Sequence, residues 1–146
     1  MKFLNSFQPL GLLILRSVLG IIFMVHGYPK LTQSTAALQG MFVQHGLPGQ
    51  FVYVSGVLET FGGLLLILGL FARGAALLLA VEMGVAIVKV HGVHGILALR
   101  EYEFPLTLAA SAVAIAVVGA GVLSADNIVL GEGRAARSRA AKPAKK

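Results

Sequence analysis

The chain has no cysteine, and only 12% of its 146 residues are charged. The lack of cysteine excludes disulfides, thiolate metal sites, iron–sulfur ligation by cysteine and thiol redox chemistry. The low charge accompanies 57% hydrophobic residues and a mean hydropathy of +0.85, far from the averages of soluble proteins. A water-soluble fold of this length cannot bury so much apolar surface. The composition therefore indicates a membrane protein in which any electron chemistry uses a bound cofactor or a partner.

Four apolar segments, at about 10–27, 51–71, 74–91 and 105–123, are each close to the roughly 20 residues that a spanning helix needs. They predict an all-α, integral membrane four-helix bundle with a tight hairpin between the second and third helices. The domain is expected at 1–126, followed by a basic, disordered cytoplasmic tail at 127–146. Pro29, Gly46 and Pro48 predict a loop after the first helix, with a short surface helix in it. Pro105 is expected in the first turn of the fourth helix.

The basic residues predict the orientation of the chain. Six of the twelve Lys and Arg residues lie in the last thirteen positions, and Lys2 and Arg73 are expected on the same membrane face. Because positive residues concentrate on the cytoplasmic side, both termini are expected in the cytoplasm, with the chain in the inner (plasma) membrane. The net charge of +6 belongs mainly to this tail, so nucleic-acid binding is not expected and the lipid bilayer is the expected partner.

Three ionisable residues, Arg16, Glu59 and Glu82, lie inside apolar segments, where an unpaired charge costs several kcal/mol. At about 1.5 Å per residue, Arg16 lies about 9 Å and Glu82 about 12 Å from the cytoplasmic starts of their helices. The matching depths predict an intramembrane ion pair between Arg16 and Glu82. The pair could be a structural lock that only fixes helix register, or it could be functional.

A second group of polar residues gathers near the expected outer ends of the helices. Glu59 lies in the outer half of its helix, and the group is expected to line one cavity that opens outward as a candidate ligand-binding site. A simpler alternative for Glu59 is a protonated acid that is hydrogen-bonded to backbone. No metal site is expected, because the histidines lack a further ligand at fixed spacing. The candidate ligand-binding residues are Glu59, His26, His91, Lys30 and Glu103.

Several short motifs, in their order along the chain, resemble the DoxX family of small bacterial four-helix membrane proteins, over about 12–126. The resemblance implies the four-helix fold and a link to redox chemistry, since some relatives look like the quinone-reducing membrane part of thiosulfate oxidation. The family's breadth leaves the activity open, and no site residue is transferred from it. The motifs are Arg16, Gly20, Phe23, His26-Gly27, Lys30-Leu31, Phe42, Gly46-Leu47-Pro48, Glu59, Gly62-Gly63, Gly69, Arg73, His91, Glu103, Pro105-Leu106 and Gly119-x-Gly121-x-x-Ser124-x-Asp126.

Three functions are compatible with these residues. The leading hypothesis is a redox-linked membrane subunit that binds a quinone-like small molecule, because a quinone ring needs acid and base groups beside an apolar channel. No electron-carrying group is evident in the sequence, so a redox partner protein is expected and an enzyme acting alone is not. The alternatives are a non-enzymatic scaffold that recruits partner proteins, and a small transporter or proton pathway, which would require a homo-oligomer.

Overall fold

The computed structural model describes residues 6–33, 36–91 and 99–129, and every regular element in these ranges is helical. The long helices are α2 (Gln8–Thr32), α4 (Phe51–Leu68), α5 (Ala72–Ala86) and α6 (Leu99–Val118). A π-helical turn, η1 (Ile87–His91), continues α5, and two short helices, α3 (Ala36–Gln44) and α7 (Ala125–Val129), complete the described chain. The structure confirms the all-α prediction.

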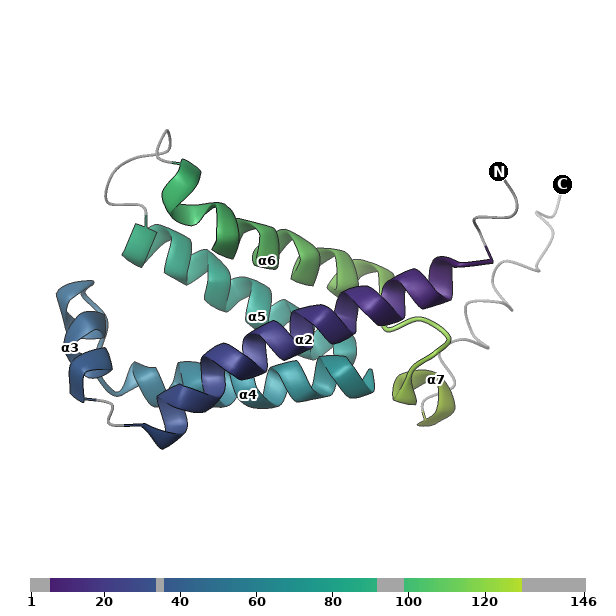
Figure 1. The fold of residues 1–146 in the computed structure, drawn as a ribbon, viewed down its shortest axis with the longest axis horizontal. Helices are drawn as coiled ribbons and strands as arrows, with labels where there is room; N and C mark the ends of the chain where they lie inside the picture. Colours follow the sequence, from purple (N-terminus) through teal and green to yellow (C-terminus); the bar gives the residue numbers. More distant parts are fainter. Residues whose placement is uncertain (1–5, 34–35, 92–98, 130–146) are drawn as a thin grey trace, which may run out of the picture.

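The long helices run alternately up and down between two ends of the bundle (Figure 1). The α7 end contains the start of α2, the connection between α4 and α5, the end of α6, and α7. The α3 end contains the end of α2, α3, the start of α4, η1 and the start of α6. The most extensive contacts join α2 to α4 and α5 to α6, whereas α2 and α5 have few direct contacts. The helices α2 and α5 are therefore diagonal neighbours in the bundle.

Three helices, α2, α4 and α6, are long and apolar enough to cross a membrane. Large apolar side chains cover their outer surfaces, including Val18 and Val25 on α2 and Val117 on α6. So much exposed apolar surface is unfavourable in water and favourable in lipid. The chain is therefore a multi-pass membrane protein. The helix α5 has 15 residues and reaches 20 only together with η1.

The bundle packs closely because small residues lie where its helices meet. A Cβ atom on Gly20 of α2 would overlap the carbonyl oxygen of Gly63 of α4, and one on Gly63 would overlap that of Gly20. On the other side of the bundle, Ala76 of α5 and Ala112 of α6 are completely buried. Close approach maximises dispersion contacts, which drive helix association where lipid removes the usual hydrophobic driving force.

Two helices near the α3 end are longer than the sequence predicted. The first was expected to end at residue 27, but α2 continues through Pro29 to Thr32 and therefore includes Lys30. The fourth was expected to begin at Pro105, but α6 begins at Leu99, so Pro105 lies in its interior rather than in its first turn. A proline lacks the backbone N–H that donates a helical hydrogen bond, but neither helix ends at its proline. The predicted short surface helix is confirmed by α3, which has no buried residue.

Glycines end two helices earlier than predicted at the α7 end. The second helix ends at Leu68 rather than 71, because Gly69 adopts a left-handed conformation with φ of 66°. The fourth ends at Val118 rather than 123, because Gly119 and Gly121 have φ of 94° and 79°. The chain then forms α7, which crosses the domain boundary predicted after residue 126. The predicted disordered tail from residue 130 onward lies outside the described residues.

Candidate ligand-binding site

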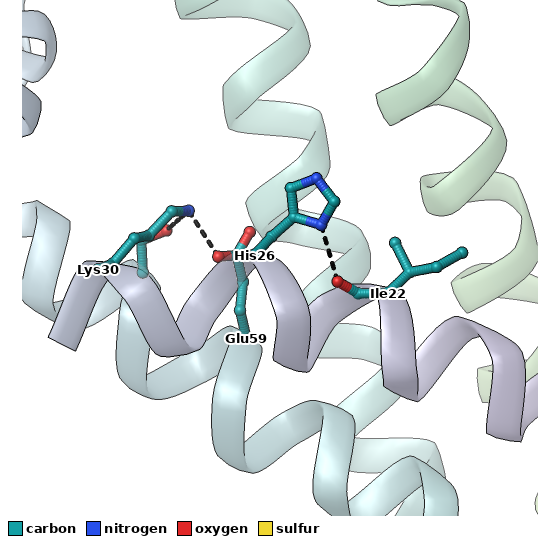
Figure 2. Close-up of polar contacts among 5 residues, drawn as sticks. Ile22, His26, Lys30 and Glu59 are labelled. Atoms are coloured by element: carbon teal, nitrogen blue, oxygen red, sulfur yellow. Dashed lines mark hydrogen bonds and ion pairs between the residues drawn. The ribbon is translucent and has the colours of Figure 1, made fainter. Parts of the chain in front are cut away.

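Lys30 and Glu59 form an ion pair between α2 and α4, with 2.5 Å between Nζ and Oε2. Figure 2 shows the two side chains pointing toward each other from these helices. Glu59 is buried, whereas the Lys30 side chain keeps 20% of its surface exposed. The ammonium group therefore offsets the carboxylate charge inside the bundle, while part of the Lys30 side chain stays exposed. The structure brings these two predicted site residues together.

The ion pair extends toward a second carboxyl group on α5. Lys30 Nζ also donates a hydrogen bond to Ser55 Oγ at 2.7 Å. Glu82 lies beside Ser55, Glu59 and Lys30, which are its electrostatic neighbours. Both Glu82 carboxylate oxygens are buried, and neither has a well-formed hydrogen bond within the described residues. Four polar side chains from three helices thus form one cluster.

His26 lies one helical turn before Lys30 on α2, with its ring tilted against that of Phe104 at 5.8 Å between centroids. Its Nδ1 donates a hydrogen bond of 2.8 Å to the carbonyl oxygen of Ile22, as Figure 2 shows. A carbonyl only accepts hydrogen bonds, so this contact places a proton on Nδ1. A neutral ring then presents Nε2 as an acceptor, and a charged ring presents it as a donor.

These polar groups line a cavity of about 540 Å³ between the helices at the α3 end. The remaining lining is almost entirely apolar and includes aromatic rings from α2, α3, α4 and α6. The volume is in the range of sites that hold ligands of drug size, which are typically apolar with a few polar groups. The polar lining residues are His26, Lys30, Ser55, Glu59 and Glu82, and the aromatic ones are Phe23, Phe42, Phe51 and Phe104.

Two predicted site residues are not placed in this cavity. Glu103 is exposed on α6 and does not line it. The exposed position follows from the longer α6, which moves Glu103 from the predicted loop into the second turn of a helix. The backbone of His91 ends η1, and its side chain lies outside what the structure describes. Among the described residues, no group of three or more His, Asp and Glu side chains could hold a metal ion.

The predicted ion pair between Arg16 and Glu82 is wrong. Arg16 Nη2 donates a hydrogen bond to the carbonyl oxygen of Leu123, and its acidic neighbour is Asp126. Glu82 belongs to the Lys30 cluster instead. Matching depths did not bring the two residues together, because a long arginine side chain leans toward the N-terminus of its own helix, here the α7 end, where Arg16 reaches Leu123.

Asp126 is a structural residue that is not among the predicted site residues. Its carboxylate accepts hydrogen bonds from the backbone N–H groups of Phe71 at 2.7 Å and Ala72 at 3.0 Å. It therefore caps the start of α5, where Phe71 has a positive φ of 48° and no cap from its own side chain. The Asp126 N–H donates to the Gly69 carbonyl at 2.8 Å. A Cβ on Gly69 would overlap the Arg16 guanidinium, so one compact cluster joins α2, α5 and α7.

Ser55 and the place of Glu82 in the cavity were not predicted from the sequence. A signal for Ser55 was present, because residues four apart lie on one helical face and Ser55 precedes Glu59 by four. The same spacing relates His26 to Lys30. The predicted hairpin made α4 the expected neighbour of α5, but nothing in the sequence indicated that Glu82 would lie beside Glu59 and Lys30. The cavity therefore has two carboxyl groups, one ammonium group, one imidazole and one hydroxyl beside an apolar space.

Comparison with known proteins gives one family. A family model described as DoxX matches residues 11–92. A protein of Bacillus subtilis (strain 168), with the name "Putative oxidoreductase CatD", is 32% identical over 126 residues, covering 86% of this chain and 92% of its own length. An uncharacterized protein of Haemophilus influenzae is 38% identical over 91 residues, covering 62% of this chain and 66% of its own. No solved structure gives a significant match.

Proposed function

The chain belongs to the DoxX family, and we propose that it is a redox-linked membrane subunit that binds a quinone-like small molecule in the cavity at the α3 end. The observation that carries this proposal is the cavity itself. It joins an apolar space of about 540 Å³ to polar side chains, of which Glu59 is buried, Lys30 and Glu82 are half-buried and His26 is exposed. The name of the Bacillus relative, which contains the word oxidoreductase, supports the same class of function.

A quinone ring matches the chemistry of this lining. Its carbonyl oxygens accept hydrogen bonds, which Lys30, the His26 ring or a protonated carboxyl group can donate. Its reduction to the hydroquinone consumes two electrons and two protons, and Glu59, Glu82 and His26 can exchange protons at the ring. The chain has no cysteine to carry the electrons. In this proposal a redox partner protein supplies them, and the bundle binds the quinone and exchanges its protons.

The proposal includes the orientation of the chain. We propose that α5 with η1 is a fourth span, that both termini are cytoplasmic and that the cavity lies toward the outer face of the inner membrane. A reporter fused after Arg73 and one fused at the C-terminus should both report the cytoplasm, because basic residues concentrate on that face. A reporter between α3 and α4 should report the outside. A cytoplasmic signal from this third fusion contradicts the orientation.

The role of the ion pair is tested by replacing it completely. In the double variant Lys30→Met with Glu59→Leu, stability should remain within about 1 kcal/mol of the wild type, because apolar pairs often replace buried ion pairs at little cost. Affinity for a decyl-tailed benzoquinone in lipid nanodiscs should fall about tenfold or more, because a hydrogen-bonding partner of the ring is lost.

The single variant Lys30→Met is the control for this experiment, because it leaves the Glu59 carboxylate buried without its cation. It should be less stable than the double variant by about 3 kcal/mol, as expected when one member of a buried pair is removed. Quinone retention by nanodiscs and melting temperature are the two readouts. Wild-type affinity in a normally stable double variant contradicts a binding role for the pair and favours a scaffold.

A further inference from the structure

Of the two carboxyl groups that line the cavity, Glu82 is the one without an ion-pair partner among the described residues, so it is available to a ligand. Glu59 is already paired with Lys30, and the second contact of Lys30 goes to Ser55. The two oxygens of Glu82 are buried at the cavity wall with Ser55 as their neighbouring hydroxyl, and neither oxygen has a hydrogen bond of normal geometry among the described residues. Buried polar groups without partners are unfavourable, and they are rare in folded proteins. A ligand group that hydrogen-bonds to Glu82 would satisfy it.

The cavity is also open on one side, between α4 and α5. These helices are joined at the α7 end and separate toward the α3 end (Figure 1). Six apolar residues line the cavity and yet remain 43–59% exposed: Val54 on α4 with Leu78, Val81 and Val85 on α5, and, nearer the α3 end, Phe51 on α4 and Phe104 on α6. A side chain can line a cavity and still be exposed only where the cavity opens. The four residues between α4 and α5 are all apolar, so the opening on this side does not suit a water-soluble group.

The depth of the opening indicates what it faces. Val81 lies nine residues after the first residue of α5, which is about 14 Å along the helix axis. This is near the middle of a hydrocarbon layer about 30 Å thick. At the α3 end the cavity is also lined by apolar side chains, those of Met41, Phe42 and Leu47, and Met41 is exposed there. The lateral opening therefore faces lipid chains and is a suitable exit for an apolar tail.

We infer that the ligand places its polar ring against Glu82 and extends an apolar tail between α4 and α5 into the bilayer. This inference rests on the proposed function and specifies its ligand class as lipid-soluble tailed ring compounds. As an acid, Glu82 can both donate and accept, so it can hydrogen-bond to ring carbonyls and to ring hydroxyls. The tail adds affinity through its contacts with Val54, Leu78, Val81 and Val85.

Two valine variants test the path of the tail. Val81 lines the opening, whereas Val117 on α6 is also largely exposed and does not line the cavity. Each valine is replaced by Trp in the full-length protein, which is studied in nanodiscs. Quinone concentrations are expressed per lipid, because a tail increases the partitioning of the quinone into the bilayer. Val81→Trp should weaken binding of a decyl-tailed benzoquinone about tenfold but change binding of the tail-less ring less than threefold. Val117→Trp should change neither affinity. Equal affinities for the tailed quinone in the two variants overturn the lateral path.

Three Glu82 measurements test the ring contact. Glu82→Leu should weaken binding of both the tailed and the tail-less ring about tenfold, whereas Glu82→Gln, which keeps hydrogen-bonding capacity, should stay within threefold. Infrared difference spectra should show a carboxyl band that shifts when the quinone binds to the wild type and is missing in Glu82→Gln. This third readout remains available if Glu82→Leu does not fold.

The outcomes separate the two proposals. Unchanged affinities in Glu82→Leu, or a shifting band that persists in Glu82→Gln, overturn the ring contact while the quinone site remains. A wild-type protein that retains neither benzoquinone overturns the proposed function and this inference with it.

Discussion

Replacing Gly63 with Leu should remove most of the folded protein. The Cβ atom alone would overlap the backbone carbonyl of Gly20, and backbone cannot move aside as a side chain can. The two helices α2 and α4 would have to separate along the contact that also positions Lys30 against Glu59. A destabilisation of about 3 kcal/mol or more is expected, at the upper end of overpacking effects. Protein yield and melting temperature in mild detergent measure it.

Gly74→Leu is the control for this substitution. A Cβ atom on Gly74, near the start of α5, would meet nothing within 4 Å. Replacing a helical glycine at an open position should leave stability unchanged or raise it by about 0.5–1 kcal/mol, because glycine is a poor helix former. Similar losses in the two variants would mean that close approach of α2 and α4 does not hold the bundle together.

Removing the Asp126 carboxylate should have the second large effect. Asp126→Ala deprives the N–H groups of Phe71 and Ala72 of their acceptor and leaves Arg16 without its acidic neighbour. Hydrogen bonds to charged groups contribute about 1.5–3 kcal/mol each, so a loss of about 3–5 kcal/mol is expected. Asn127→Ala on the same short helix, which removes one hydrogen bond to Val122, should cost about 1 kcal/mol or less.

Double-mutant cycles read by the same melting measurements distinguish the partner of Arg16. Substitutions of Arg16 and Asp126 should be non-additive, because they share one cluster at the α7 end. Substitutions of Arg16 and Glu82 should simply add, since Arg16 belongs to the cluster around Asp126 and Glu82 to the cluster around Lys30. A non-additive effect of the Arg16 and Glu82 substitutions would instead indicate an ion pair between these two residues, which the structure does not contain.

The sequence predicted the helical class because apolar length and composition are local properties. The apolar segments and the loop with its short helix α3 follow from hydropathy and from Pro and Gly positions. The helix ends were less accurate. Gly69 and Gly119 end helices inside apolar runs, which hydropathy alone extends. The short helix α7 was not expected, because it depends on Asp126 reaching back to the start of α5.

The candidate site could be predicted only in part, because a single sequence does not specify which side chains of different helices face each other. Glu59, His26 and Lys30, which were expected at a similar depth, line one cavity, and their role in binding a ligand stays a prediction. Glu82 was predicted to pair with Arg16 because the two residues were expected at matching depths in the membrane. Which helices adjoin is decided by surface complementarity, here by the close contact of Gly20 with Gly63. That contact pairs α2 with α4 and leaves α5 across the bundle from α2.

The most direct test of the quinone site is analysis of what the protein retains from its own membrane. The wild type and the double variant Lys30→Met with Glu59→Leu are purified in the same mild detergent, and extracts are compared by absorbance and mass spectrometry. The proposal predicts about one quinone per wild-type chain and a large loss in the double variant, with phospholipid unchanged as the internal control. Equal amounts of quinone in the two proteins, or phospholipid alone in the wild type, would contradict a quinone site in this cavity.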